Sequence, residues 1–248
     1  MEQIIHIADT TSTSDTLLEL VKSNKQLAEG TMVCADFQTN GRGQASNKWE
    51  SERGKNLLFS ILTFPDFIRP SQQFLISQAA SLAVVDFLSL CCGLKDIKVK
   101  WPNDIYCGDG KICGMLIETS LLGANFEYAI AGVGININQT EFFSNAPNPV
   151  SVCQLNGKIF NLDICAVQMH QFYMARYMQL CNGEYDSIRQ EYKKMLYWND
   201  GQHRYCDADG EFDAEIADVK DSGVLVLKTS DGNLREYWHK EVEFMNHK

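Results

Sequence analysis

Proline and glycine are scarce in this sequence, which has 5 and 17 of them among its 248 residues. Collagen-like and low-complexity chains are rich in both, so the composition excludes those classes. No internal repeat is visible, which argues against a solenoid. Apolar residues make up 45% of the chain. A globular chain of this length can bury a sizeable core without disulfides or metals.

Positive charge is also in short supply. Lys and Arg number 22 against 32 Asp and Glu, for a formal net charge of -10. A general nucleic-acid binder needs basic surface to displace phosphate counterions, so we expect no nucleic-acid partner. The first residues, Met1-Glu2-Gln3, lack the basic segment of a secretory signal. We therefore expect a cytoplasmic protein.

One stretch, residues 74–94, is apolar and long enough to span a membrane. It contains polar side chains spaced three to five residues apart, which are Gln78, Ser81, Asp86 and Ser89. This spacing is typical of a helix with one exposed face. We therefore predict a largely buried helix of a soluble protein, opened by Pro70-Ser71, and no membrane association.

Cysteine pairs and histidine pairs are absent. None of the nine cysteines forms a CxxC pair, and their irregular spacing predicts reduced thiols that pack as small hydrophobic residues. The five histidines show no HExxH or other paired metal spacing. We therefore expect the histidines to be structural or surface residues, and the sequence identifies no metal ligand.

Hairpin signals mixed with unpaired helices predict an α+β fold and not a regular βαβ repeat. The strongest signal is Gly108-Asp109-Gly110, a tight-turn sequence between the β-compatible runs 97–107 and 111–119. Near the amino terminus we expect a helix capped by Ser14 or Asp15.

The last part of the chain has a different pattern, with short alternating strands predicted over 212–219, 223–229 and 235–238. Strands at this spacing are typical of a small β-barrel or β-sandwich. We place the boundary near Trp198, which divides the chain into a main domain, residues 1–198, and a small β domain, residues 199–248.

Three stretches have features that a plain scaffold does not need. In Gly41-Arg42-Gly43, which runs on to Trp49, glycines allow close approach to a ligand and arginine offers a planar fork for a carboxylate or phosphate. In Lys100-Trp101-Pro102-Asn103-Asp104, followed by Lys111, proline inside a strand-like run implies an edge or a bulge. In Gly132-Val133-Gly134-Ile135-Asn136, the glycines weaken a strand unless something packs closely there. A flexible loop, a solvated lysine and close strand packing are the respective alternatives.

In this order, the three stretches resemble the bacterial biotin–protein ligases, in the short form without an amino-terminal DNA-binding domain. Lys111-Ile112-Cys113-Gly114 adds to the resemblance, and Ser12-Thr13-Ser14 is similar to the family's Ser-Thr-Asn segment. The resemblance implies the class II synthetase-like biotin/lipoate ligase fold, a mixed, largely antiparallel sheet flanked by helices. It also implies that the carboxy-terminal part is a small SH3-like β-barrel.

The resemblance further implies an ATP-dependent biotin–[acetyl-CoA-carboxylase] ligase. Such an enzyme activates biotin to biotinyl-5′-AMP and then transfers it to a lysine of a biotin carboxyl carrier domain, in a biotin-dependent carboxylase or decarboxylase. ATP and Mg²⁺ are the expected cofactors, and the Mg²⁺ ligands are unknown. Homodimer formation through an exposed sheet edge stays open, because no motif bears on it.

The resemblance assigns the site residues as well. Lys111 is expected to be catalytic, together with Arg42, because a cation near the biotin carboxylate and the α-phosphate neutralises both. The biotin contacts would be Ser12, Thr13, Ser14, Gln38, Gly41, Arg42, Gly43, Gln44, Lys111 and Gly114. The ATP contacts would be Trp49, Asn103, Asp104 and Asn136.

Two positions depart from the family's pattern. Ser14 stands where the family usually has Asn, and Gln44 stands where many members have a second Arg. The second difference removes a fixed positive charge and keeps hydrogen-bonding capacity. A looser hold on the adenylate is therefore expected.

Two other functions stay open. One is a related lipoate-type carrier-protein ligase of the same fold, which a substrate panel would distinguish. The other is a biotin-sensing binding protein or repressor. Repressors of this kind carry an amino-terminal helix-turn-helix domain, whereas this chain starts at the first expected strand, and its net charge of -10 disfavours DNA binding.

Overall fold

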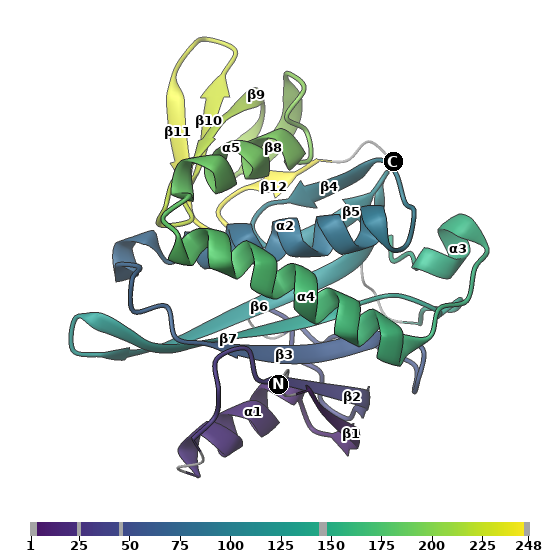
Figure 1. The fold of residues 1–248 in the computed structure, drawn as a ribbon. Coiled ribbons are helices and arrows are strands. Elements are labelled where there is room, and N and C mark those ends of the chain that lie inside the picture. The colour runs from purple at the N-terminus through teal and green to yellow at the C-terminus, as the bar shows by residue number, and fades with distance from the viewer. Residues whose placement is uncertain (1–3, 24–25, 45–46, 144–147, 246–248) are drawn as a thin grey trace.

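The main sheet of the molecule has seven strands in the order β1-β2-β3-β7-β6-β5-β4 (Figure 1). The computed structural model describes residues 4–23, 26–44, 47–143 and 148–245. The strands are β1 (Ile4–Thr10), β2 (Met32–Gln38), β3 (Leu57–Thr63), β4 (Ile97–Lys100), β5 (Asp104–Cys107), β6 (Gly110–Leu122) and β7 (Asn125–Ile135). Strands β1 and β2 are parallel, and the other neighbouring pairs are antiparallel. The predicted mixed, largely antiparallel sheet is therefore confirmed.

Helices pack on both faces of this sheet. The helices are α1 (Thr13–Lys22), α2 (Phe74–Leu90), α3 (Val152–Asn156), α4 (Leu162–Cys181) and α5 (Tyr185–Met195), with a 3-10 turn at Pro70–Gln72. Because successive strand residues point to opposite faces, neighbours in β2 join different cores. Cys34 belongs to the large core that contains α2, α4 and α5, whereas Val33 packs with Leu17 of α1 in a smaller cluster.

Helix α2 is buried on almost every side, between the main sheet and helices α4 and α5 (Figure 1). The segment Pro70–Leu90 is long and apolar enough to cross a membrane, and 72% of its most apolar window is buried inside the fold. The prediction of a largely buried helix is therefore confirmed. The prediction of one exposed face was wrong for Gln78 and Ser81, which are 0% exposed, whereas Asp86 is partly exposed and Ser89 is exposed.

The run 97–107 forms two strands and not one. Strand β4 ends at Lys100, β5 begins at Asp104, and these two residues face each other in an antiparallel pair. Pro102 cannot donate to a sheet ladder, and it lies in the turn between the strands. The prediction of a single strand over 97–107 was therefore wrong, whereas the predicted edge is present, because β4 is the last strand of the sheet. The turn brings Asn103 to β6, where its side chain donates a hydrogen bond to the carbonyl of Met115.

The chain after residue 199 builds a second sheet, which is antiparallel and has the strand order β11-β10-β9-β8-β12. Its strands are β8 (His203–Asp207), β9 (Gly210–Val219), β10 (Leu225–Thr229), β11 (Leu234–Tyr237) and β12 (Glu243–Phe244). A small five-stranded antiparallel sheet of this kind agrees with the expected SH3-like module. The division at Trp198 as a limit between domains stays a prediction.

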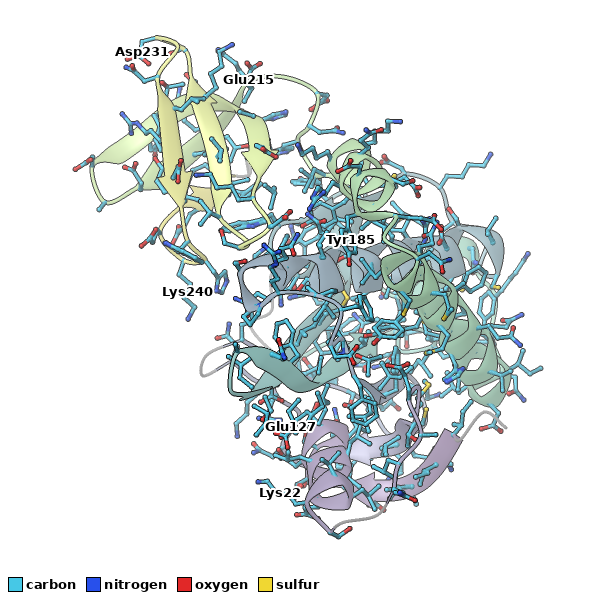
Figure 2. All side chains as sticks on the ribbon, turned by 60° about the vertical axis from the view of Figure 1, so that its left-hand side comes forward. Lys22, Glu127, Tyr185, Glu215, Asp231 and Lys240 are labelled. Carbon is cyan, nitrogen blue, oxygen red and sulfur yellow. The ribbon has the colours of Figure 1, made fainter. Side chains whose placement is uncertain are left out.

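Polar contacts hold the second sheet against the main one. Arg189 of α5 donates two hydrogen bonds to Asp221, at 2.7 and 2.6 Å. Trp101 of the β4–β5 turn donates its indole N–H to the carbonyl of Gly223 at 2.9 Å. Figure 2 shows the result, in which Lys240 lies at the end of the second sheet that faces the main sheet, far from Asp231 at the opposite end.

Candidate active site

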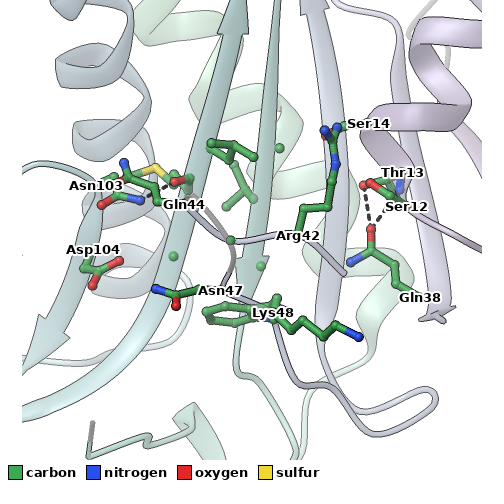
Figure 3. A pocket seen from close by; sticks show the side chains of 18 of the residues that line it. Ser12, Thr13, Ser14, Gln38, Arg42, Gln44, Asn47, Lys48, Asn103 and Asp104 are labelled. Carbon is green, nitrogen blue, oxygen red and sulfur yellow. Dashed lines mark hydrogen bonds between the residues drawn. The ribbon is translucent and has the colours of Figure 1, made fainter. Parts of the chain in front are cut away.

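A cleft over strands β6 and β7 brings together every predicted site residue except Gly41 and Asn136 (Figure 3). The predicted residues that line it are Ser12, Thr13, Ser14, Gln38, Arg42, Gly43, Gln44, Trp49, Asn103, Asp104, Lys111 and Gly114. Other described residues that line it are Asn47, Lys48, Met115, Leu116, Gly132, Val133, Gly134, His239 and Lys240. Segments more than 200 residues apart in sequence therefore form one site, as the positions of Ser12 and Lys240 show.

One end of the cleft is a neutral hydrogen-bonding network at the start of α1. Gln38 accepts hydrogen bonds from the backbone N–H of Thr13 at 2.8 Å and from its hydroxyl at 3.1 Å. The hydroxyls of Thr13 and Ser14 each lie 2.8 Å from the hydroxyl of Ser60. Ser60 was not predicted, although it is a polar residue between apolar neighbours in a fully buried strand. The network contains no charged side chain and can recognise a neutral polar group.

The glycines of β6 and β7 leave space for side chains inside the cleft. Gly114 and Gly134 are opposite each other in the sheet. A Cβ atom on Gly134 would lie 2.5 Å from the indole of Trp49, and one on Gly114 would lie 2.8 Å from it. A Cβ atom on Gly132 would lie 2.6 Å from the hydroxyl of Ser14. These positions therefore need glycine because side chains of the cleft walls, Trp49 and Ser14, pack directly against them.

Lys111 provides a cation next to the Trp49 ring. Its ammonium lies 2.7 Å from a carboxylate oxygen of Asp104 and 5.8 Å from the ring centroid of Trp49. The backbone of Lys111 is fixed by hydrogen bonds with Asn148, at 2.8 Å, and Val150, at 3.0 Å. An anion that enters the cleft can therefore compete with Asp104 for a lysine whose backbone is already in place.

Arg42 does not present a free guanidinium group to the cleft. It donates hydrogen bonds to both carboxylate oxygens of Glu118, at 3.0 and 2.6 Å, and lies 3.0 Å from a carboxylate oxygen of Asp15. In this structure two carboxylates occupy the fork of Arg42, and the assignment of Arg42 to a ligand stays a prediction. Arg42 connects the loop after β2 to α1 and β6. Neither Asp15 nor Glu118 was predicted, because only the folded chain brings them to residue 42.

The second sheet contributes His239 and Lys240 to the cleft. The expectation that His239 is merely structural or on the surface was therefore incomplete. Its ring packs edge-on against Trp101, with the ring centroids 6.3 Å apart. Burial lowers the pKa of His239, and the neighbouring charge of Lys240 lowers it further. No carboxylate among the described residues forms an ion pair with Lys240, so its charge is available to an anion.

Gly41 and Asn136 act behind the cleft wall. A Cβ atom on Gly41 would lie 2.8 Å from the carbonyl oxygen of Trp49, so the glycine lets the loop fold back on itself. The side chain of Asn136 is buried and donates a hydrogen bond to the carbonyl of Val150 at 3.1 Å. Asn136 thus supports the segment that holds Lys111 and does not line the cleft.

Comparison with known proteins identifies the family. Residues 7–136 match the biotin/lipoate A/B protein ligase family, and this chain belongs to that family.

Individual relatives agree with this assignment. The bifunctional ligase/repressor BirA of Bacillus spizizenii is 28% identical over 98% of this chain and 74% of its own length. The biotin–[acetyl-CoA-carboxylase] ligase of Paracoccus denitrificans is 32% identical over 50% of this chain and 52% of its own. A structure of the Aquifex aeolicus biotin protein ligase in complex with biotin and ATP matches with a TM-score of 0.80 and 20% identity, and covers 100% of both chains. At that identity the match establishes the fold.

Proposed function

We propose that this chain is a biotin–protein ligase, which activates biotin with ATP and transfers it to a lysine of a carrier domain. One observation carries the proposal: a single cleft has a neutral hydrogen-bonding network at one end and, at the other, a lysine beside a tryptophan. Biotin has the complementary shape, with a neutral ureido ring at one end and a carboxylate at the other.

The ureido group would bind to Ser12, Thr13, Ser14 and Gln38. A ureido ring has both N–H donors and a carbonyl acceptor, and hydroxyl and amide side chains can satisfy both kinds of group. The hydroxyls of Thr13 and Ser14 are already oriented by Ser60. Lipoate ends in an apolar dithiolane ring, which can exchange no hydrogen bonds with these side chains, whereas the ureido group can. The network therefore favours biotin over lipoate.

Lys111 would stabilise the negative charges of the substrates in the first step. The carboxylate of biotin attacks the α-phosphorus of ATP, pyrophosphate leaves, and biotinyl-5′-AMP stays bound. The ammonium of Lys111 neutralises the two anions as they approach and then stabilises the phosphate that forms. No covalent bond to the enzyme is needed, so positioning and electrostatics account for the rate.

The second step transfers biotin to the acceptor. The lysine ammonium of the carrier loses a proton to water, and the amine nitrogen attacks the carbonyl carbon of biotinyl-5′-AMP. The carbon–oxygen bond to the phosphate breaks with its electron pair on AMP. The second proton leaves the nitrogen as the amide forms. Lys111 stabilises the departing phosphate.

Trp49 and Asp104 fit the expected nucleotide and metal. The indole of Trp49 offers an aromatic face for the adenine. Mg²⁺ is usually held by one or two carboxylates together with phosphate oxygens, and Asp104 is the carboxylate that lines the cleft. When bound, the metal would supply positive charge to the phosphates of ATP. Asp104 would then exchange its contact with Lys111 for the metal and leave the lysine to the substrates.

We infer the partner and the compartment from the same proposal. The acceptor would be the biotin carboxyl carrier domain of a carboxylase or decarboxylase, as the name of the Paracoccus relative suggests for acetyl-CoA carboxylase. The nine free cysteines fit a reducing compartment such as the cytoplasm.

The experiment combines the purified protein with biotin, MgATP and a purified carrier domain, and detects the product by avidin blotting. Wild-type protein is expected to label the carrier. Lys111→Ala should reduce labelling on the order of 10²-fold or more, while Lys228→Ala, on the second sheet, serves as a control. Labelling with lipoate and none with biotin would overturn the proposal in favour of a lipoate ligase.

A further inference from the structure

A second cavity of about 200 Å³ opens next to the active cleft and shares part of its wall. The shared residues are Gln44, Asn103, Met115 and Leu116. Figure 3 shows Gln44 and Asn103 side by side at this edge of the cleft. We call the second cavity the side groove. A molecule in the side groove would therefore meet a ligand in the cleft across Gln44 and Asn103.

Besides Gln44 and the β4–β5 turn, the walls of the side groove come from three parts of the fold. Phe74 and Ser77 belong to α2, Ile117 and Thr119 to β6, and Ser222 to the second sheet. None of the described residues that line it has a charged side chain. The apolar side chains of Phe74 and Ile117 among these walls suit a group with an aliphatic stem. Without cations it does not suit the phosphates of a nucleotide.

The side groove lies where the main sheet leaves β6 uncovered. Strand β5 pairs with β6 as far as Gly114, whereas β6 continues to Leu122 and pairs with β7 along its other edge. In the described part of the chain, no strand covers the remaining edge of β6. A partner can therefore reach the side groove from outside without displacing an element of the fold.

One polar atom at the junction lacks a partner. The side-chain carbonyl oxygen of Gln44 is buried and accepts no hydrogen bond from any described residue. A buried acceptor without a donor costs about 1–3 kcal/mol, so an N–H donor is the group that this place would stabilise. Because Gln44 is neutral, it also does not repel a cation. The ammonium group of a lysine is both an N–H donor and a cation, and its stem is apolar.

We propose that the side groove admits the side chain of the acceptor lysine. Its aliphatic stem lies between Phe74 and Ile117, and its nitrogen reaches the carbonyl oxygen of Gln44 at the edge of the cleft. From there the amine attacks the carbonyl carbon of the adenylate, as described for the transfer step. This inference rests on the proposed ligase function and adds to it a separate entrance for the second substrate.

The test separates the two half-reactions. Biotin-dependent exchange between pyrophosphate and ATP reports on adenylate formation and needs no acceptor, whereas carrier labelling reports on transfer. Ser77→Phe fills the side groove from α2, and Ser89→Phe, at an exposed position of the same helix, is the matched control. We expect Ser77→Phe to slow transfer about 10²-fold, as misplacement of a reacting group does, and to leave exchange unchanged.

A second variant guards against a folding defect. Thr119→Trp fills the side groove from an exposed position of β6, and Leu122→Trp, at the hairpin end and 73% exposed, is its control. The adenylate made by both groove variants should still react with hydroxylamine, which is too small to need the side groove. Wild-type transfer rates in both variants, or a parallel loss of exchange and transfer in both, would overturn the inference. Absence of exchange in the wild type would instead overturn the proposed function on which the inference rests.

Discussion

Arg42 and Glu118 are joined through both ends of the guanidinium group, with donor–acceptor distances of 3.0 and 2.6 Å. The two residues are 76 positions apart, and Asp15 adds a third oxygen at 3.0 Å. The charge of Arg42 is thus balanced before any phosphate enters. The pair fastens the loop that contains Trp49 to the strand that forms the floor of the cleft.

Replacing Glu118 should loosen that loop. In Glu118→Gln the ion pair is lost, and for a half-exposed pair this is worth up to about 1 kcal/mol, or about a fivefold change in an equilibrium constant. We expect faster release of biotinyl-5′-AMP, measured by trapping the free adenylate with hydroxylamine in the absence of carrier. Glu127→Gln, an exposed position on β7, should behave as wild type. Equal release from all three proteins would show that the pair does not hold the loop.

Gly134 should tolerate no side chain while Trp49 is present. The Cβ atom of Gly134→Ala would lie 2.5 Å from the indole, and overpacking of this kind costs about 1–3 kcal/mol. We expect a KM for ATP raised at least about tenfold. The matched test is a double-mutant cycle with Trp49→Ala, in which the glycine substitution should add little to the effect of losing the indole. Additive effects would mean that Gly134 acts through something other than Trp49.

Lys240 should bind the phosphates of ATP. It lines the cleft, and its φ angle of 72° makes Asn a suitable replacement, because Asn tolerates that backbone conformation. Lys240→Asn should raise the KM for ATP about tenfold, the effect of losing one charge-assisted hydrogen bond, and leave the KM for biotin unchanged. High salt should weaken the difference. An unchanged KM for ATP at low salt would exclude this contact.

The buried thiols should resist alkylation. Burial raises the pKa of Cys34 and of Cys92 to about 12 and that of Cys165 to about 11. Since the thiolate is the reactive form, only about one in 10⁴ of the Cys34 thiols is reactive at pH 8. Mass spectrometry after treatment with iodoacetamide should find these three unmodified in the native protein and modified after denaturation. Rapid native labelling of Cys34 would contradict the packing described.

Near the cleft, the sequence predicted one local feature correctly and missed another. Gly108-Asp109-Gly110 forms the expected hairpin between β5 and β6, because tight turns depend on adjacent residues. The start of α1 was missed: Ser12 and not Ser14 or Asp15 is the N-cap, and its side chain makes no capping hydrogen bond. The sequence does not distinguish a serine whose hydroxyl caps a helix from a serine whose hydroxyl lines a cleft.

Long-range contacts account for the other differences. Much of α2 that was predicted to be exposed is buried, because α4 and α5, which are encoded more than 70 residues later, pack on this helix. His239 was predicted to be a structural or surface residue. No sequence motif connects it with Trp101, which is 138 positions away, although the two rings are in contact. Hydrophobic periodicity and short motifs describe neighbouring residues only, so they cannot predict contacts between residues far apart in the sequence.

The β4–β5 turn faces two ways. Asp104 at its end belongs to the cleft, while Trp101 at its start is 5% exposed and donates to the carbonyl of Gly223 in the second sheet. The segment from Lys100 to Asp104 thus forms part of the cleft wall and also contacts the second sheet. Shortening the chain to its first sheet would strand a large aromatic side chain in water. Loss of the second sheet would therefore act on the same segment that supplies Asp104 to the cleft.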